Sequence, residues 1–251
     1  MITLYTNFNA VCGQKIEFLL NHSALDYNKI DVNLRNGEQH QSVFLKLNPA
    51  AQVPVLLDDD KIVLESNEIC RYLDTYLLDE HYSQCDPVLL NQWLDQVHTA
   101  IHPACSVISW SLAIRPAMLN KTLEALKQHF ANIPDAERRK RQQRAFELGL
   151  ELPELHQAIA TYQHFVCSMR DQLSITPWLA GDQISLADFC VIPYLIRLEH
   201  LSFNSIIDRF PEVCNWLSQI KLERGFEQVF ILNYPSGFIQ QWQQYGLQAK
   251  L

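Results

Sequence analysis

One short segment constrains this chain more than any other: residues 48–73, NPAAQVPVLLDDDKIVLESNEICRYL. Two apolar runs, residues 53–57 and 62–64, flank an acidic turn at 58–60, and this pattern predicts a β-hairpin. Pro54 has no amide proton, so it belongs at the open mouth of the first strand rather than inside a paired ladder. The segment therefore fixes one edge of a sheet and the point where a helix must follow.

That helix is predicted to begin directly after the hairpin. Ile69 and Leu73 stand four residues apart, as on one face of a helix, and Ser66 is a residue type favoured at an N-cap. A cis bond between Val53 and Pro54 turns the adjacent backbone outward, where a peptide-like ligand can pair with it. A helix start beside such a backbone is suited to a carboxylate. Together these features predict a site for a small acidic peptide.

Composition limits what the whole chain can be. Its 251 residues are 48% hydrophobic and 19% charged, as in folded soluble proteins. A net charge of −8 argues against a nucleic-acid partner held by bulk electrostatics. Seven cysteines without a CxxC pair favour a reducing compartment. With no signal-peptide pattern at the start and no uncharged apolar run of membrane-spanning length, we expect a cytoplasmic protein without a membrane partner.

The chain divides into two domains by its secondary-structure pattern. In residues 1–80 strands are expected at 2–5, 29–32, 53–57 and 62–64, and helices at 13–22, 42–47 and from 65 onward. This β-α-β-α-β-β-α order predicts a small α/β domain. The boundary is expected at residues 81–87. Residues 88–251 are expected to be all-helical, with helices at 88–114, 120–130, 136–150, 154–173, 185–199 and 211–219. Pro103 is expected to kink the first of these helices or to end its first half.

A second local signal lies at residues 178–189, WLAGDQISLADF. With Ser185 as N-cap, Asp188 falls at N3, where its side chain can accept a hydrogen bond from the Ser185 amide. Ile184 and Phe189 occupy the positions of a hydrophobic staple. This capping box serves folding, and we assign it no catalytic role.

The two signals, in this order and in these two domains, resemble the glutathione S-transferase superfamily. QVPVL and ES stand in the hairpin and helix, and AGDQISLADF stands in the helical domain, as the family has them. The resemblance implies a thioredoxin-like N-terminal domain, an all-helical C-terminal domain and glutathione as co-substrate. Within the superfamily, PACSVISWSLAI at 103–114 and the insert-like IPDAERRKRQQRAF at 133–146 look closest to the bacterial β-etherases and reductive dehalogenases.

The family's glutathione contacts carry over to this chain by position. They fall on His40, Gln52, Val53, Pro54, Glu65 and Ser66. The resemblance implies that the Val53 backbone pairs with the cysteinyl part, that Glu65 and Ser66 hold the γ-glutamyl end, and that His40 and Gln52 lie near the glycine carboxylate. The residues alone leave simpler interpretations open, because His40 can be an ordinary loop residue and Ser66 a plain helix cap.

The residue that activates the thiol is less obvious. Aligned through the LDY sequence at 25–27, the usual serine position falls on Ala10, which has no hydroxyl, and Cys12 follows two residues later. A cysteine at a helix N-terminus is acidified and can form a mixed disulfide with glutathione, as in the cysteine-using branches of the family. The amide of Asn9 is another candidate donor to a thiolate. Alternatively, Cys12 is a small buried residue that packs the helix start.

Three further features have both a functional and a structural interpretation. His98 and His102 stand at i and i+4, but no third ligand has matching spacing, so no metal site is predicted and we expect exposed or structural histidines. The basic run at 138–144 is expected to be solvated helix surface paired with acidic neighbours at 135, 137 and 147. Trp110 is a candidate for the pocket of an apolar second substrate, or a core residue.

We therefore expect a cytosolic, homodimeric glutathione transferase with a role in detoxification, which attaches the glutathione thiol to an electrophilic apolar small molecule without a metal. The first alternative is a glutathione-dependent reductive or thiol-exchange enzyme that uses Cys12 for dehalogenation, ether cleavage or deglutathionylation. The second is a non-catalytic glutathione-binding or protein-interaction module, which the missing hydroxyl at Ala10 keeps open.

Overall fold

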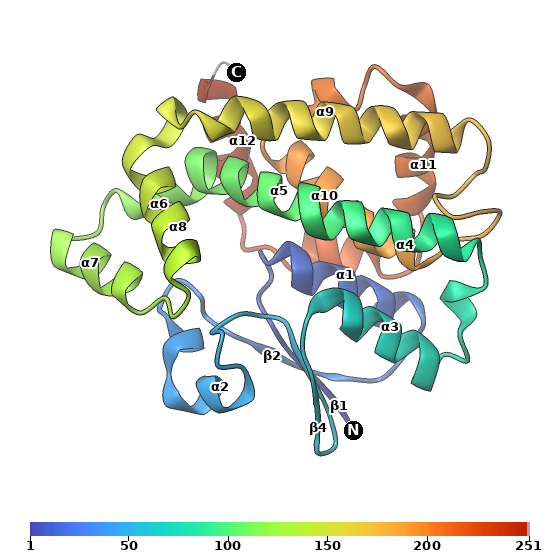
Figure 1. Cartoon of the computed structure of the whole chain (residues 1–251), viewed down its shortest axis with the longest axis horizontal. Coiled ribbons are helices and arrows are strands. Elements are labelled where there is room, and N and C mark those ends of the chain that lie inside the picture. The colour runs from blue at the N-terminus through green and yellow to red at the C-terminus, as the bar shows by residue number, and fades with distance from the viewer. Residues whose placement is uncertain (250–251) are drawn as a thin grey trace.

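A small sheet carries a large bundle of helices, and the computed structural model describes residues 1–249 (Figure 1). The N-terminal elements are β1 (Ile2–Thr6), α1 (Val11–His22), β2 (Asn28–Asp31), α2 (Ser42–Leu47), β3 (Val55–Asp58), β4 (Lys61–Val63) and α3 (Ser66–Leu77). Their order is the one that the sequence predicts, which confirms the α/β, thioredoxin-like N-terminal fold. The first helix begins two residues earlier than expected, at Val11.

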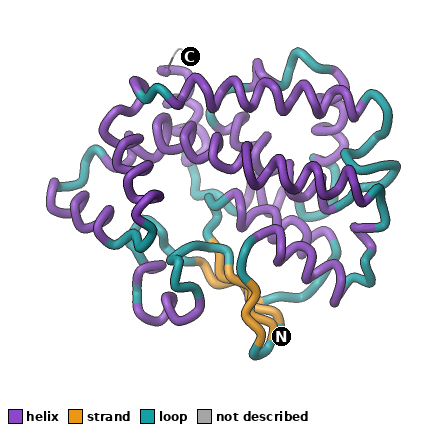
Figure 2. The backbone as a smooth tube through the Cα atoms, in the orientation of Figure 1, coloured by secondary structure: helices purple, strands orange, loops and turns teal. Residues whose placement is uncertain are grey.

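The four strands lie in the order β2-β1-β3-β4 at the lower edge of the molecule (Figure 2). β1 is parallel to β2 and antiparallel to β3, and β3 and β4 form the predicted hairpin. Successive residues of β3 point to opposite faces. Leu56 belongs to the main core, which includes α1 and α3, whereas Val55 packs in a smaller cluster with Phe44 of α2. The sheet is therefore covered on both faces.

The rest of the chain is helical, as expected. Its α-helices are α4 (Pro87–Gln96), α5 (His102–Ser109), α6 (Arg115–Met118), α7 (Leu123–Ala131), α8 (Ala136–Leu148), α9 (Glu154–Leu173), α10 (Leu186–His200), α11 (Pro211–Ile220) and α12 (Phe238–Ala249). Helix α12 is not predicted from the sequence, because five glutamines are interspersed among its apolar residues. The division into domains at residues 81–87 stays a proposal, because one continuous core joins the two parts: Phe18 of α1 packs on Phe189 of α10, with ring centroids 5.0 Å apart.

The long helix that opens the second part departs from expectation. It runs from Pro87 to Met118 with two π-helical turns, Val97–Ile101 and Trp110–Ile114. The expected kink at Pro103 is thus replaced by a π-helical turn that ends at Ile101, and the helix continues past Pro103. By length and composition this helix could cross a membrane, but more than half of its apolar window is buried within the protein. It packs against α9 and α10, as a core helix does.

The predicted capping box at the start of α10 is confirmed. The carboxylate of Asp188 accepts hydrogen bonds from the Ser185 amide at 2.9 Å and from the Leu179 amide at 3.1 Å. It also accepts one from the indole of Trp216 at 2.8 Å. Because Asp188 is fully buried, these bonds replace the water that the carboxylate loses. They fix the helix that brings Tyr194 to the site described next.

Candidate active site around Cys12

Cys12 is the second residue of α1, close to the N-terminus of that helix. Ala10 has an extended backbone and serves as N-cap, and its carbonyl accepts from the amides of Gly13 and Gln14 at 2.8 and 2.9 Å. A Cβ atom at position 13 would lie 2.0 Å from the hydroxyl oxygen of Thr6, so only glycine lets α1 pack this closely on β1. The helix start, with its free amides and partial positive charge, is thus held beside the sheet.

The side chain of Cys12 contacts two polar groups from distant helices. Its Sγ lies 3.5 Å from Nδ1 of His102 on α5 and 3.7 Å from the hydroxyl of Tyr194 on α10. The same hydroxyl lies 3.1 Å from Nδ1 of His102. Tyr194 is fully buried, whereas Cys12 and His102 are partly exposed. A thiol, an imidazole and a phenol therefore form one cluster that remains open on the side of Cys12.

This environment acidifies the cysteine. Burial alone raises the pKa of Cys12, but the charge of His102, the hydrogen bond to that imidazole, the charge of Lys15 and the bond to Tyr194 together lower the pKa to about 6. Conversely, the thiolate of Cys12 outweighs burial and raises the pKa of His102. Burial raises the pKa of Tyr194 well above its ordinary value, so the phenol stays protonated and can donate. At neutral pH the cluster holds a thiolate.

Lys15 lies one turn beyond Cys12 on α1 and is almost fully buried. Its ammonium group donates to Oδ1 of Asn67 at 2.8 Å and lies 5.9 Å from the centre of the Tyr194 ring. Among residues 1–249 no carboxylate lies within ion-pairing distance of Lys15, although buried charges are usually paired. Burial lowers the pKa of Lys15, but neighbouring thiols and Glu65 raise it by more, so the group stays charged. The Cys12 thiolate is one of its counter-charges.

The other two candidates at the sulfur end are already engaged. The backbone carbonyl and the side-chain oxygen of Asn9 accept from the buried guanidinium of Arg197, at 2.7 and 3.0 Å. The amide of Ala10 donates to the carbonyl of Asn7 at 2.9 Å. These contacts brace the loop before α1, and Cys12, the second residue of the helix, is the candidate whose side chain contacts His102 and Tyr194.

The sequence does not single out His102 or Tyr194 as partners of Cys12. His98 is exposed, as expected, but His102 faces Cys12, and residues 1–249 contain no cluster of three metal-ligating side chains. The i, i+4 spacing drew attention to a metal, whereas the partner of His102 lies 90 positions away. One signal was available: His102 directly precedes Pro103 in an otherwise apolar stretch, and the π-helical turn found there is a feature common at functional sites.

The predicted peptide site has the expected backbone. The Val53–Pro54 bond is cis, and the ladder between β1 and β3 ends at Val55, so Val53 lies beyond it. Val53 and Ser66 are partly accessible, and Glu65 is exposed. The expectation that Ser66 is the N-cap of α3 is wrong by one residue: the helix begins at Ser66, and Glu65, with φ of +61°, is the cap. The Ser66 amide and hydroxyl therefore both stand at the helix start.

The peptide end of the site, at Glu65, acts electrostatically on the groups around Cys12. The carboxylate of Glu65 contributes to raising the pKa of both Lys15 and His102, so it lies within reach of the Cys12 cluster. Gln52 is exposed, and its carbonyl accepts from Nδ2 of Asn48 at 2.8 Å, which holds the loop before Pro54. His40 is partly buried on the loop before α2.

Trp110 lies within a second aromatic cluster. It is 8% exposed and packs against Phe130 of α7, which in turn packs on Phe146 of α8.

The basic run at residues 138–144 has different partners from those expected. Arg144 pairs with Glu154 at 3.2 Å, while Asp135 caps α8 by accepting from the Arg138 amide. The guanidinium of Arg138 reaches the carbonyl of Ala50 at 2.9 Å, in the N-terminal part of the chain.

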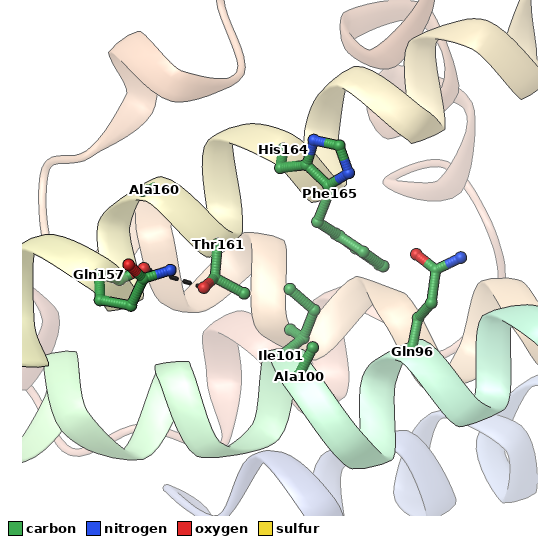
Figure 3. Close-up of a pocket in the computed structure, with 8 residues that line it drawn as sticks. All are labelled: Gln96, Ala100, Ile101, Gln157, Ala160, Thr161, His164 and Phe165. Atoms are coloured by element: carbon green, nitrogen blue, oxygen red, sulfur yellow. Dashed lines mark hydrogen bonds between the residues drawn. The ribbon is translucent and has the colours of Figure 1, made fainter.

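A separate hollow of about 230 Å³ lies between α9 and the first π-helical turn (Figure 3). Its lining consists of Gln96, Ala100, Ile101, Gln157, Ala160, Thr161, His164 and Phe165. None of the predicted site residues is among them, and the set offers a single ionisable side chain. We assign this hollow no part in the chemistry.

A thioredoxin-like sheet, a helical second part and an acidified cysteine at the start of α1 define a class of thiol-handling proteins that bind a small peptide. Two family models match the chain: the glutathione S-transferase N-terminal domain over residues 1–75 and the C-terminal domain over residues 169–221. The chain belongs to the glutathione S-transferase superfamily.

Individual relatives agree with this assignment. Protein LigF of Sphingobium sp. strain SYK-6 is 25% identical over 224 residues, which cover 84% of this chain and 86% of LigF. Glutathione S-transferase 3 of Zea mays is 27% identical, covering 85% of this chain and 86% of the relative. The crystal structure of the beta-etherase LigF superposes with a TM-score of 0.80, covering 91% of this chain and 98% of LigF. The branch and the fold that the sequence predicts are thereby confirmed.

Proposed function

We propose that the protein is a glutathione-dependent enzyme in which Cys12 forms a mixed disulfide with the glutathionyl sulfur. The observation that carries this proposal is the contact of Cys12 with His102 and Tyr194, which lowers the pKa of the thiol to about 6. Glutathione would lie with its cysteinyl backbone at Val53, its γ-glutamyl end at Glu65 and Ser66, and its sulfur toward the start of α1. Positioning and thiolate stabilisation supply the catalysis.

The first chemical step is thiol exchange. The Cys12 thiolate attacks the glutathionyl sulfur of a mixed disulfide R–S–SG, forming Cys12–S–SG and releasing RS⁻, which takes the proton from the His102 imidazolium. A second glutathione, as thiolate, then attacks Cys12–S–SG, releasing oxidised glutathione and restoring the Cys12 thiolate, while its proton returns to His102. His102 therefore acts first as an acid and then as a base, as its contact with Cys12 allows.

Direct conjugation is the second candidate. In that reaction the glutathione thiolate itself attacks an apolar electrophile, and the protonated phenol of Tyr194 and the helix start stabilise it. Membership in the superfamily and the likeness to a beta-etherase and to plant glutathione transferases favour this reaction. The cluster of Trp110, Phe130 and Phe146 is our candidate for the wall that receives the apolar group.

Three measurements separate these reactions. Incubation with oxidised glutathione, followed by intact-mass and peptide mass spectrometry, should place one glutathionyl group on Cys12. Turnover of a glutathionylated peptide with loss in a Cys12→Ser variant supports exchange, whereas full turnover of a chloro-nitroaromatic by that variant supports conjugation. If the protein binds glutathione but turns over neither substrate, it is a non-catalytic glutathione-binding module. If it does not bind glutathione, thiol exchange, conjugation and the binding module are all contradicted.

We also propose that the protein is a cytoplasmic homodimer, as is usual in the family. Exposed apolar side chains occur on β4, α3 and the start of α4: Ile62 is 41% exposed, Tyr76 67% and Val88 72%. A partner surface on these elements would cover them. Light scattering coupled to size exclusion checks this, and a monomeric mass at micromolar concentration would contradict it.

A further inference from the structure

A buried arginine of α10 contacts the loop that precedes Cys12. Arg197 is 5% exposed and follows Tyr194 by three positions, so the two side chains leave neighbouring points on one face of the helix. Its guanidinium donates to the carbonyl and to the side-chain oxygen of Asn9, at 2.7 and 3.0 Å. It also donates to the hydroxyl of Ser109 on α5 at 3.0 Å. One side chain of α10 therefore joins α5 to the loop before α1.

The charge of this guanidinium has no anionic partner. Among residues 1–249 no carboxylate lies within 4.0 Å of Arg197, and its Nε has no hydrogen-bond partner there. Burying a charge without a counter-charge is costly, because the group loses its hydration. The ring of Trp242 on α12 offsets part of this cost, since its centre lies 4.7 Å from Cζ of Arg197. What the guanidinium provides here is a fixed set of hydrogen bonds to neutral oxygens.

The C-terminal segment contacts the same loop. Phe8 packs edge to face on Tyr234 and on Phe238, with ring centroids 5.5 and 5.2 Å apart. Helix α12 is fixed on the end of α10, because a Cβ atom at Gly246 would collide with the carbonyl oxygen of Leu201. The same helix packs on the second π-helical turn, which follows α5 directly. The loop before α1 is therefore held by the last helix of the chain as well as by α10.

We propose that Arg197 is a positioning residue for the chemistry at Cys12. It acts through Asn9 on the loop before α1 and through Ser109 on α5, the helix that carries His102. A guanidinium is planar and donates in fixed directions, so it sets the separation of these two elements more narrowly than an ammonium group could. They are the elements that bring Sγ of Cys12 to 3.5 Å from Nδ1 of His102. The inference rests on the proposed function.

The proposal links the sulfur end of the site to the candidate pocket wall. Ser109 directly precedes Trp110, so the guanidinium holds the loop before α1 and the start of that wall in one arrangement. Trp242 keeps the guanidinium in place from α12. The C-terminal helix, which the sequence does not predict, thereby affects the chemistry at Cys12 through Arg197.

Thiol-exchange kinetics with a glutathionylated peptide and the pH profile of Cys12 alkylation test this role. Arg197→Lys keeps the charge and loses the planar fork, so kcat should fall about tenfold or more while KM stays within about twofold. The alkylation midpoint should rise, because the contact of Cys12 with His102 loosens. Asn9→Ala and Trp242→Leu, which each remove one contact of the guanidinium, should lower kcat by less. Asn9 is partly exposed, so its variant tests the contact even where Arg197→Lys is destabilised.

Arg209 provides a matched control. Its guanidinium also donates to a backbone carbonyl, that of Ser205 at 3.2 Å, and lies 6.0 Å from the ring centre of Phe210. None of these three residues belongs to the site. Arg209→Lys should therefore leave kcat, KM and the alkylation midpoint as in the wild type.

A double variant shows whether Arg197 acts through Asn9. Arg197→Lys combined with Asn9→Ala should be no slower than Arg197→Lys alone, and fully additive losses overturn the proposal. Wild-type kcat and midpoint in Arg197→Lys overturn it too, as does a lower melting temperature with unchanged kinetics, which makes Arg197 purely structural. If the wild type forms no glutathionyl adduct on Cys12, the proposed function fails, and the alkylation profiles still decide the role of Arg197.

Discussion

The two halves of the candidate site are built in different ways. The half that would hold the glutathione backbone is local: Val53, Pro54, Glu65 and Ser66 lie within one hairpin and the helix after it. The half that would handle the sulfur is assembled from three helices, with His102 and Tyr194 lying 90 and 182 positions from Cys12. Ligand recognition therefore leaves a readable pattern in the sequence, whereas the acidity of the thiol arises only when α1, α5 and α10 pack together.

Cys12→Ser should produce the largest effect and should affect only the sulfur half. The hydroxyl cannot form a disulfide, so the glutathionyl adduct should disappear and thiol exchange should fall on the order of 10³-fold or more. Glutathione affinity should change by less than about twofold, since the backbone contacts remain. Cys167→Ser, at another partly exposed free cysteine on α9, is the control. Loss of glutathione binding in Cys12→Ser alone would show that the two halves are not separable.

His102→Phe should weaken thiolate formation without removing the thiol. His102 supplies the largest of the contributions that lower the pKa of Cys12, so in this variant the pKa should return toward its ordinary value of 9.0. The rate of Cys12 alkylation at pH 7 should fall at least about tenfold, because most of the thiolate is lost. His98→Phe, one turn earlier on the same helix and exposed, should alkylate as the wild type does. Equal rates in the two variants would remove His102 from the account.

Ser66→Ala changes the half of the site that would hold the glutathione backbone and leaves the sulfur half unchanged. Loss of one hydroxyl to the γ-glutamyl carboxylate should weaken glutathione binding about tenfold, or ~1.4 kcal/mol, measured by calorimetry. The pH profile of Cys12 alkylation should not move. Ser42→Ala, at the corresponding first position of α2 and exposed, is the matched control. A shifted Cys12 profile in Ser66→Ala would contradict the division of the site.

Lys15→Met should have the smallest effect on the chemistry. The charge of Lys15 lowers the pKa of Cys12 less than His102 does, so the midpoint of the alkylation profile should rise by less than in His102→Phe. Folding should be preserved, because the substitution removes a charge whose burial is costly and leaves no carboxylate within residues 1–249 unpaired. Thermal melting and the alkylation profile check both points. A larger midpoint shift than in His102→Phe would make Lys15 the principal partner of the thiolate.

The sequence predicts the locally built half of the site better than the half that is assembled from distant helices. The hairpin, the helix after it and the Ser185–Asp188 capping box were predictable, because each depends on residues a few positions apart. The cis bond before Pro54 and Cys12 at the start of α1 were also anticipated. Ser66 was misplaced by one residue because Glu65 adopts a positive φ that its residue type does not suggest.

The remainder depended on tertiary packing. The sequence indicates only an exposed or structural role for His102, because its partner Cys12 lies 90 positions away in the chain. The basic run was expected to pair with its own acidic neighbours, but Arg138 reaches Ala50, a contact 88 positions apart that no helical spacing encodes. α12 was missed because its glutamines obscure an apolar face that becomes evident only against the core.

The pH dependence of Cys12 alkylation in the wild-type protein, followed peptide by peptide, tests the central claim most directly. As pH rises, the thiolate fraction of Cys12 increases through its pKa, and the rate should rise with a midpoint near pH 6. Cys85 and Cys214, whose pKa values are raised mainly by burial, provide internal references. A Cys12 midpoint near 9.0, the ordinary value for a thiol, would show that the cluster does not acidify it and would contradict the proposed chemistry.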